Sequence, residues 1–376
     1  MPATRYFATC ARGLEPILAD ELGGLQARDV AVGRGGVAFA GGKALLYKAN
    51  LWLRTGVRVL RPVLEAPVTT PEELYAAVQT VDWSEYLTPD HTLAVDCNVR
   101  DSHITHSQYA ARVVKDAICD QFIARCGRRP SVDPERPMVG LNLHVYKDEA
   151  VLSLDSSWDS LHKRGYRPVL TNAPLNEALA AALVLRTGWR GERPFVDPLC
   201  GSGTLPIEAA WIALNRPPGL TRKHFGFMGW MDYDVRLWTR LRDEAREGAG
   251  KRLGHPVIGA DERRDAVEHS RANARAAGVG HLVRFDVRDV RDFAPPDGPP
   301  GVIVCNPPYG ERIGEEKDLR GLYRTLGEVF RRCVGWDVWV FTGNPRLGAL
   351  IDLPRLDEVP LFNGKIPCKF IRFQTG

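Results

Sequence analysis

The sequence predicts an α/β protein in which a parallel sheet, covered by helices on both faces, follows smaller α+β units. The first observation is an alternation of short apolar runs and long helical patterns that begins at Ala173. We expect strands at residues 194–197, 256–260, 281–286, 301–305 and 336–342 and helices at 175–187, 204–214, 262–276 and 318–332. Strands that alternate with helices favour a parallel sheet, because each crossover helix packs against that sheet. The second observation is that the units before Ala173 are shorter and mix hairpins with helices.

Two units make up the first half of the chain. The first combines helical spacing, a hairpin pattern around Gly35-Gly36, a second helix and a strand, at residues 14–25, 30–40, 43–54 and 57–64. The second has a strand at 93–99, a helix that Ser107 caps and Gly127 ends, and a hairpin of residues 141–146 and 150–154. We therefore predict domains at residues 1–62, 63–158 and 173–376, with a polar, basic linker at 159–172.

Composition restricts the classes of protein that the chain can belong to. No stretch approaches the ~20 apolar residues of a membrane span, and the first residues lack the apolar core of a signal peptide. The 8 cysteines form no CxxC pair and have no histidine at zinc-ligand spacing. We expect free thiols, no metal and a cytoplasmic location. The net charge of +4 is weak support for a polyanionic partner.

A glycine turn follows the first strand of the second half, in the segment FVDPLCGSGTLPIEAA that begins at Phe195. Gly201 and Gly203 let the backbone approach a ligand closely, and the helix that begins near Thr204 points free N–H groups at it. A dinucleotide fingerprint would have glycine where Pro206 stands. The segment also lacks the Gly-Lys-Ser/Thr of a phosphate-binding loop.

Acidic residues end three of the predicted strands, at Asp197, Asp261 and Asp289. Asp261 can accept both ribose hydroxyls of a nucleoside, Asp289 an adenine amine, and Asp197 an ammonium group, directly or through water. The glycine loop contains no lysine or arginine that would bind a pyrophosphate. The pattern favours a cationic adenosyl ligand, and S-adenosylmethionine fits it.

A rigid turn, VCNPPYGER, follows the apolar run Val302-Ile303-Val304. The prolines fix the backbone, so that the Asn306 side-chain oxygen and the Pro307 carbonyl can each accept one hydrogen of an exocyclic amine. Tyr309 offers a ring face for stacking on the target base. Held in this way, the amine lone pair points at the methyl donor. The gain in the rate of methyl transfer then comes mainly from orientation and electrostatic preorganisation.

Together, DPLCGSGT and NPPYGER resemble the class I S-adenosylmethionine-dependent methyltransferases that act on exocyclic amines. The first half resembles THUMP-containing RNA methyltransferases, through ARGLEPILADEL, SQYAARVVKDAICDQF and LHKRGYR. Within that group the likeness is to bacterial 23S rRNA guanine-N2 methyltransferases in their single-methyltransferase form, and it includes HFGFMGW and FNGKIPC.

The resemblance implies an N-terminal ferredoxin-like domain, a THUMP domain that docks RNA, and a Rossmann-like seven-stranded methyltransferase domain whose last strand is antiparallel. It implies methylation of guanine N2 in RNA. No strong general base is required, since the amine proton becomes acidic once the amine is methylated. We expect a monomer. The cofactor would contact Ala173, Pro174, Leu175, Asp197, Gly201, Gly203, Thr204, Asp261, Asp289 and Asn306.

Several interpretations stay open. The substrate could be tRNA instead of 23S rRNA. The same turn also serves adenine-N6 and cytosine-N4 DNA methyltransferases, although the THUMP-like half argues against DNA. A non-catalytic RNA-binding assembly factor is a further alternative, which the complete cofactor set opposes. Glu311 and Arg312 either orient the RNA or form an ion pair, and basic residues at 125, 128 and 129 contact phosphates or favour a helix C-terminus.

Overall fold

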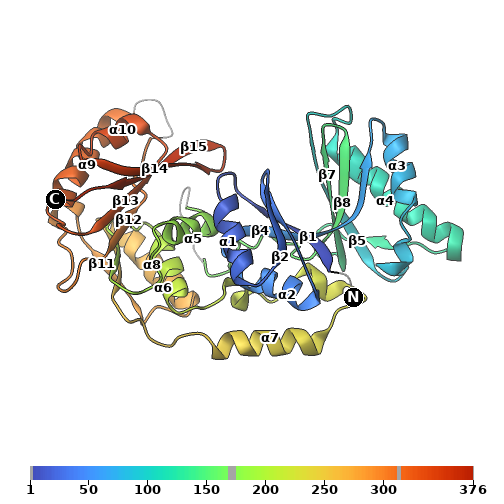
Figure 1. Ribbon diagram of the computed structural model, residues 1–376, viewed down its shortest axis with the longest axis horizontal. Coiled ribbons are helices and arrows are strands. Elements are labelled where there is room, and N and C mark those ends of the chain that lie inside the picture. The colour runs from blue at the N-terminus through green and yellow to red at the C-terminus, as the bar shows by residue number, and fades with distance from the viewer. Residues whose placement is uncertain (1–2, 168–174, 311–314, 376) are drawn as a thin grey trace.

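Two β-sheets with their covering helices form the molecule (Figure 1), which is described here by a computed structural model of residues 3–167, 175–310 and 315–375. The first sheet has eight strands in the order β2-β3-β1-β4-β8-β7-β5-β6. These strands are β1 (Thr4–Cys10), β2 (Arg28–Gly33), β3 (Gly36–Gly41), β4 (Gly56–Pro67), β5 (Thr92–Arg100), β6 (Ser131–Val132), β7 (Val139–Tyr146) and β8 (Glu149–Asp155).

The long strand β4 belongs to both N-terminal units. Its first half pairs with β1 and its second half pairs with β8, both antiparallel, and the register shifts between Pro62 and Leu64. The predicted boundary between residues 62 and 63 therefore falls inside one continuous strand. The two units share a single sheet rather than being joined by a loop.

Four helices accompany this sheet: α1 (Glu15–Gly24), α2 (Lys43–Trp52), α3 (Pro71–Gln79) and α4 (Ser107–Cys126), with a short 3₁₀ turn, η1 (Trp83–Glu85). A capping box between Thr70 and Glu73 begins α3. The N-cap of α4 is His106 instead of the predicted Ser107, whereas Gly127 ends the helix with φ 67°, as predicted. Only a residue that tolerates this left-handed conformation can end the helix in that way.

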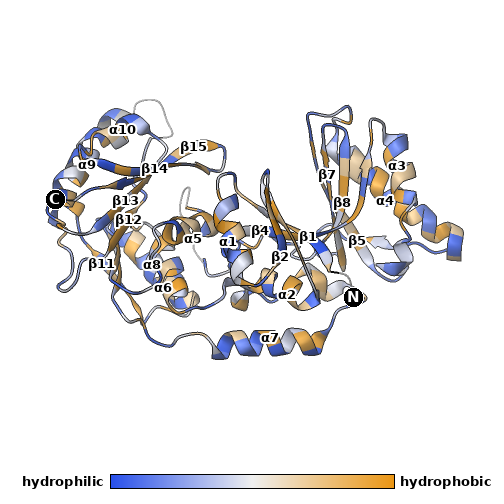
Figure 2. Ribbon diagram, in the orientation of Figure 1, coloured by the Kyte–Doolittle hydropathy of each residue, from blue (hydrophilic) through white to orange (hydrophobic). Residues whose placement is uncertain are grey.

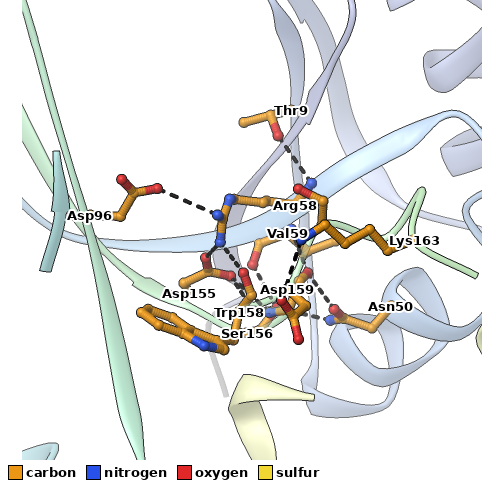
Figure 3. Close-up of polar contacts among 12 residues, drawn as sticks. Thr9, Asn50, Arg58, Val59, Asp96, Asp155, Ser156, Trp158, Asp159 and Lys163 are labelled. Atoms are coloured by element: carbon orange, nitrogen blue, oxygen red, sulfur yellow. Dashed lines mark hydrogen bonds and ion pairs between the residues drawn. The ribbon is translucent and has the colours of Figure 1, made fainter. Parts of the chain in front are cut away.

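Figure 3 shows the polar contacts at the bend of β4, where the two units meet. Arg58 forms an ion pair with the fully buried Asp155 and donates to the Trp158 carbonyl, while its backbone N–H donates to Thr9 Oγ1 at 3.0 Å. Burial raises the pKa of Asp155, and the Arg58 charge opposes that rise. Removing Arg58 would leave an uncompensated carboxyl in the interior, so the pair fixes one unit against the other.

The second sheet has seven strands in the order β11-β10-β9-β12-β13-β15-β14. They are β9 (Phe195–Asp197), β10 (Val257–Asp261), β11 (Val283–Val287), β12 (Val302–Cys305), β13 (Asp337–Thr342), β14 (Arg355–Asn363) and β15 (Ile366–Phe373). β15 runs antiparallel to both of its neighbours, and β9 to β13 are parallel. The predicted fold class, a seven-stranded Rossmann-like sheet preceded by two α+β units, is confirmed.

Helices cover both faces of this sheet, so its central strands are buried on both sides. Every residue of β12 and β13 is buried, which explains their continuous apolar sequences, VIVC and VWVF. The covering helices are α5 (Glu177–Arg186), α6 (Thr204–Ala213), α8 (Arg264–Ala276), α9 (Glu315–Arg331) and α10 (Pro345–Ala349), with η4 (Val290–Asp292) after β11. α6 is buried from Thr204 to Ile212, as expected for a helix that is largely apolar on all sides.

The segment between α6 and β10 leaves the catalytic domain and packs on the first unit. It contains η2 (Pro218–Thr221), η3 (Gly226–Gly229) and α7 (Val235–Glu247), whose apolar and polar residues alternate along the helix (Figure 2). Tyr47 of α2 stacks on Phe227 at 4.3 Å and meets the Trp238 ring edge at 5.9 Å. A Cβ at Gly229 would lie 1.9 Å from the Met138 carbonyl oxygen, so glycine is required for this contact.

The predicted linker at residues 159–172 is fixed in place where the structure describes it. Leu161, Arg164 and Tyr166 are buried, and Arg222 donates to backbone carbonyls of residues 157, 159, 160 and 163. Arg164 forms an ion pair with Glu208 of α6, and both side chains are almost fully buried (1% and 0% exposed). This pair joins the segment to the catalytic domain.

His162 in this segment should make stability depend on pH. Burial, together with the charges of Arg164 and Lys163, lowers the pKa of His162 to about 4, against ~6.5 in an unfolded chain. Between these values the unfolded chain binds more protons than the folded chain. The contribution of neutral His162 to the free energy of unfolding is therefore complete above pH ~6.5. It is lost as the pH falls toward 4, at up to ~1.4 kcal/mol per pH unit. Urea unfolding of His162→Gln at pH 7, 6 and 5 should show a shallower decline than the parent chain. Equal pH dependence in the two proteins would contradict this assignment.

Candidate functional site

An open cleft of about 1130 Å³ lies at the carboxyl ends of the parallel strands of the second sheet. Ligands of open α/β sheets bind at this edge, because successive strand ends and their loops meet there. Residues of five predicted segments line the cleft: Leu175, Asp197, Gly201, Thr204, Asp261, Asp289, Asn306, Pro307 and Tyr309. The structure therefore brings together most of the residues that the sequence singled out, although they span more than 130 positions of the chain.

Within this cleft, the glycine turn connects β9 to α6. Gly201 has φ +52°, and a Cβ built there would meet no heavy atom within 4 Å, so the turn leaves space above its backbone. Gly203 has φ +81° and packs against Phe285 and Ser270, each 3.0 Å from a hypothetical Cβ. Gly203 is not among the described residues that line the cleft. The lack of a side chain at Gly203 allows the turn and the close packing, whereas Gly201 gives a ligand access to the backbone.

Asp197 ends β9 below the cleft and is almost completely buried (2% exposed). Its Oδ1 accepts one hydrogen bond, from the backbone N–H of Leu199 at 3.1 Å. Burial raises the pKa of Asp197 well above its ordinary value, and the nearby Asp261 charge adds to the rise. A cationic group in the cleft would favour the ionised form, so this carboxyl suits the ammonium of an amino-acid moiety.

The other two predicted acidic residues already accept hydrogen bonds. Asp261 ends β10, whereas Asp289 lies two residues beyond the end of β11, at the N-cap of η4, and not at the strand end that was predicted. Asp261 accepts from the backbone N–H groups of Gly201 and Arg263, both at 3.0 Å, and so fixes the glycine turn against β10. Asp289 accepts from the backbone and guanidinium of Arg291, and these bonds hold the pKa of Asp289 below its ordinary value. Arg291 is exposed and also lines the cleft, so an adenine amine at Asp289 would share this carboxylate with Arg291.

The predicted catalytic turn follows β12 on the opposite wall of the cleft. Asn306 Oδ1 is buried and has no hydrogen-bond partner. A buried carbonyl oxygen without a partner is costly, at about 1–3 kcal/mol, unless a ligand completes it. Pro307 and Pro308 line the cleft next to Asn306. The turn therefore presents an acceptor that is ready for an N–H donor.

Tyr309 is 9% exposed and lines the same part of the cleft. Asn363, at the end of β14, donates from Nδ2 to the Tyr309 hydroxyl at 2.9 Å. The ring lies close to Gly343, where a Cβ would come within 2.8 Å of Tyr309 Cε2. The hydrogen bond from Asn363 and the absence of a side chain at Gly343 together set the position of the Tyr309 ring. Sequence reasoning did not assign Asn363 a role, although it belongs to the segment FNGKIPC.

Arg167, the last residue of LHKRGYR, is a further residue of this region to which the sequence analysis assigned no role. Its guanidinium lies 3.3 Å from the Glu177 carboxylate and donates to the Thr204 hydroxyl at 2.8 Å and to the Leu175 carbonyl at 2.5 Å. Thr204 is thus held by the segment that enters the catalytic domain. Ala173 and Pro174, which were predicted to flank the cofactor, lie outside the described residues, as do Glu311 and Arg312.

Polar and charged groups of the N-terminal units have local partners. His103 Nδ1 lies 2.8 Å from Asp148 Oδ2, and no cluster of three or more potential metal-ligating residues occurs in the part of the chain that the structure describes. Arg125 and Arg128 form exposed ion pairs with Asp82 and Asp90. None of the described helices is long and apolar enough to cross a membrane.

The strand order and the cleft define a class I S-adenosylmethionine-dependent methyltransferase fold. Family models match in three consecutive segments: an RlmL ferredoxin-like domain at residues 5–60, a THUMP domain at 68–155, and an RMKL-like methyltransferase domain at 164–372. The chain belongs to the RMKL-like methyltransferase family, in the form that carries the ferredoxin-like and THUMP domains.

Similar proteins cover the whole chain. The ribosomal RNA large subunit methyltransferase K/L of Syntrophotalea carbinolica is 47% identical, over 99% of this chain and 54% of that protein. Slr0064 of Synechocystis, whose name proposes an RNA methyltransferase, is 42% identical, over 98% of this chain and 96% of that protein. SMU.472, a proposed methyltransferase solved with SAH, superposes with a TM-score of 0.92 at 33% identity, over 100% and 99% of the two chains. The chain spans about half the length of the K/L relative.

Proposed function

We propose that the chain transfers a methyl group from S-adenosylmethionine to the exocyclic N2 amine of a guanine in RNA, and that this RNA is 23S rRNA. The buried Asn306 Oδ1 without a partner, on the wall of the cofactor cleft, carries the proposal. The THUMP domain and the K/L relative support an RNA substrate, and that relative's name supports the large ribosomal subunit. We also expect a monomer that acts in the cytoplasm.

The cleft suits the cofactor in its shape and its charge. Gly201 leaves open space above the turn, the N-terminus of α6 faces it, and three carboxyl groups surround it. In the proposed complex Asp197 attracts the ammonium, Asp261 accepts from the ribose hydroxyls and Asp289 from the adenine amine. Leu175, Gly201 and Thr204 line the cleft beside them. Bound S-adenosylmethionine supplies an electrophilic methyl group, and no residue of the chain needs to form a covalent bond.

The chain's own contribution is to make a poor nucleophile reactive. The N2 lone pair of guanine is delocalised into the ring, so the site must hold the amine in a geometry that localises it. Asn306 Oδ1 accepts one amine hydrogen and the Pro307 carbonyl accepts the other, while Tyr309 stacks on the base. The N2–carbon bond forms as the carbon–sulfur bond breaks, and the extra proton on N2 leaves to water. Such fixed acceptors act mainly through orientation and preorganisation.

An RNA base that reaches this cleft must be unpaired or turned out of its helix, since Tyr309 and Asn306 lie within the cleft. We therefore expect a single-stranded or loosely paired target. tRNA satisfies the same chemistry, so the RNA must be identified by experiment.

The test uses the purified full chain and radiolabelled S-adenosylmethionine with two separate substrates, total rRNA from cells that lack the modification and total tRNA. We expect label in the large-subunit rRNA, in N2-methylguanosine after complete digestion. Label in tRNA alone would overturn the ribosomal substrate, and label in another nucleoside would overturn the N2 assignment. Bound cofactor without transfer to either RNA would favour a non-catalytic assembly factor.

A further inference from the structure

A loop of the first unit covers the edge strand of the catalytic sheet, next to the cleft. This loop, residues 11–14, connects β1 to α1, and Figure 1 shows it (blue) beside the β14–β15 hairpin (red). A Cβ at Gly13, where φ is +90°, would lie 3.1 Å from the Pro360 carbonyl oxygen and 3.2 Å from Leu361 Cδ2. Leu14 is buried in the core of the catalytic domain. The loop is therefore seated on β14 and brings Arg12 to the catalytic domain.

Arg12 rests on an aromatic ring at the rim of the cleft. Its guanidinium lies 4.8 Å from the centroid of the Phe362 ring, and Arg12 is exposed. Phe362 directly precedes Asn363, which binds the Tyr309 hydroxyl inside the cleft. Side chains at neighbouring strand positions point to opposite faces, so Arg12 lies at the outer rim and not in the base pocket. Among the described residues Arg12 has no carboxylate within ion-pairing distance, and its charge is available to a ligand.

The same loop is tied to a second arginine–aromatic pair. The Glu15 carboxylate accepts from the backbone N–H groups of Gly13 at 2.6 Å and Gly35 at 3.1 Å, which joins the loop to the β2–β3 turn. Arg34 in that turn donates to the Tyr146 hydroxyl at 2.7 Å and lies 5.2 Å from the centroid of its ring. Tyr146 belongs to β7 of the THUMP domain. Hydrogen bonds and cation–π contacts thus connect the rim of the cleft to the THUMP domain through exposed arginines on aromatic rings.

We propose that the pairs Arg12–Phe362 and Arg34–Tyr146 form a track for the single-stranded RNA that flanks the methylated guanine; this inference rests on the proposed function. A guanidinium held on a ring offers N–H donors to a phosphate and a flat surface to a base. Because each arginine is already positioned, less side-chain freedom is lost when RNA binds. Arg12 comes from the first unit, so the N-terminal half supplies a contact at the rim of the catalytic cleft.

The test compares Arg12→Ala with the parent chain in methyl transfer to unmodified rRNA, with saturating cofactor and several salt concentrations. We expect KM for RNA to rise about tenfold with kcat within about twofold, and the slope of log KM against log salt to fall by ~0.7, the loss of one phosphate contact. Arg12→Lys should recover the salt slope but only part of the affinity. Arg34→Ala should also raise KM for RNA.

Control measurements separate this role from a structural one. Cofactor affinity and the thermal midpoint of Arg12→Ala should equal those of the parent chain. Arg252→Ala should leave KM unchanged, because this exposed arginine precedes the amino end of β10, whereas the cleft lies at the carboxyl ends of the strands. An unchanged KM in Arg12→Ala, or a rise accompanied by lower stability, would overturn the track. If the parent chain methylates no RNA, the proposed function fails. The track is then tested by comparing how tightly the parent chain and Arg12→Ala bind a labelled single-stranded RNA.

Discussion

Asn306→Ala should lower kcat for methyl transfer by about 10³-fold while cofactor affinity stays within about twofold. The reason is that Asn306 Oδ1 is the buried acceptor without a partner in the cleft, whereas the carboxyl groups proposed to hold the cofactor lie at the ends of other strands. The variant loses the group that localises the amine lone pair and keeps the glycine turn. Single-turnover transfer with labelled cofactor measures the first effect, and calorimetric titration with S-adenosylhomocysteine measures the second.

Two further variants test whether the loss of activity in Asn306→Ala comes from the lost acceptor oxygen. Asn306→Asp retains an acceptor oxygen at the same position and should keep more activity than the alanine variant. Asn363→Ala removes the bond to the Tyr309 hydroxyl but no acceptor for the amine, so its effect should be smaller than that of Asn306→Ala. Loss of cofactor binding in Asn306→Ala would mean that this side chain holds the cofactor and that the base pocket lies elsewhere.

Arg164→Met should lower the free energy of unfolding by about 3–5 kcal/mol. Arg164 pairs with Glu208 at 3.6 Å where both side chains are nearly inaccessible, and it donates to the Leu161 carbonyl at 2.6 Å. Burial raises the pKa of Glu208, and the charges of Arg164 and Arg54 oppose that rise. Without Arg164 the Glu208 carboxyl loses its ion-pair partner in the interior. Urea unfolding followed by circular dichroism at pH 7 measures the difference.

A double variant separates the lost charge pair from lost packing. Arg164→Met combined with Glu208→Leu removes both charges and should be less destabilised than Arg164→Met alone, since no buried charge remains unpaired. Arg240→Met serves as the matched control, because Arg240 pairs with Glu244 at the surface, where such pairs contribute at most about 1 kcal/mol. Equal losses in the buried and exposed variants would contradict the argument from burial.

The cofactor side of the site was predictable because parallel strands bring their carboxyl ends to one edge of a sheet. Asp197, Asp261 and Asn306 each follow an apolar run, and Asp289 follows β11 by two residues. Their places after parallel strands were enough to put them around one cleft. The sequence did not distinguish the two glycines, however. Gly201 opens onto the cleft and Gly203 packs against Phe285, a difference that depends on a strand more than 80 residues away in the sequence.

The residue patterns alone did not reveal the last two strands. β14 contains Pro360 and alternates only weakly, and it lies at the edge of the sheet, where proline is tolerated and one side needs no strand partner. Contacts that depend on this edge, such as Asn363 with Tyr309 and Arg12 with Phe362, were therefore hidden as well. They join residues whose sequence neighbourhoods carry no common signal, and only the folded chain brings them together.

The continuous strand β4 has a consequence for how a guanine is chosen. Because one strand runs through both N-terminal units, and the α7 segment fastens the first unit to the catalytic domain, the THUMP domain cannot swing freely relative to the cleft. With RNA as the substrate, such a molecule would hold the THUMP domain at a fixed distance from the cleft that receives the guanine. A guanine would be selected by its distance from the structure that the THUMP domain grips, so that inserting or deleting base pairs between the two should move or abolish the methylated position.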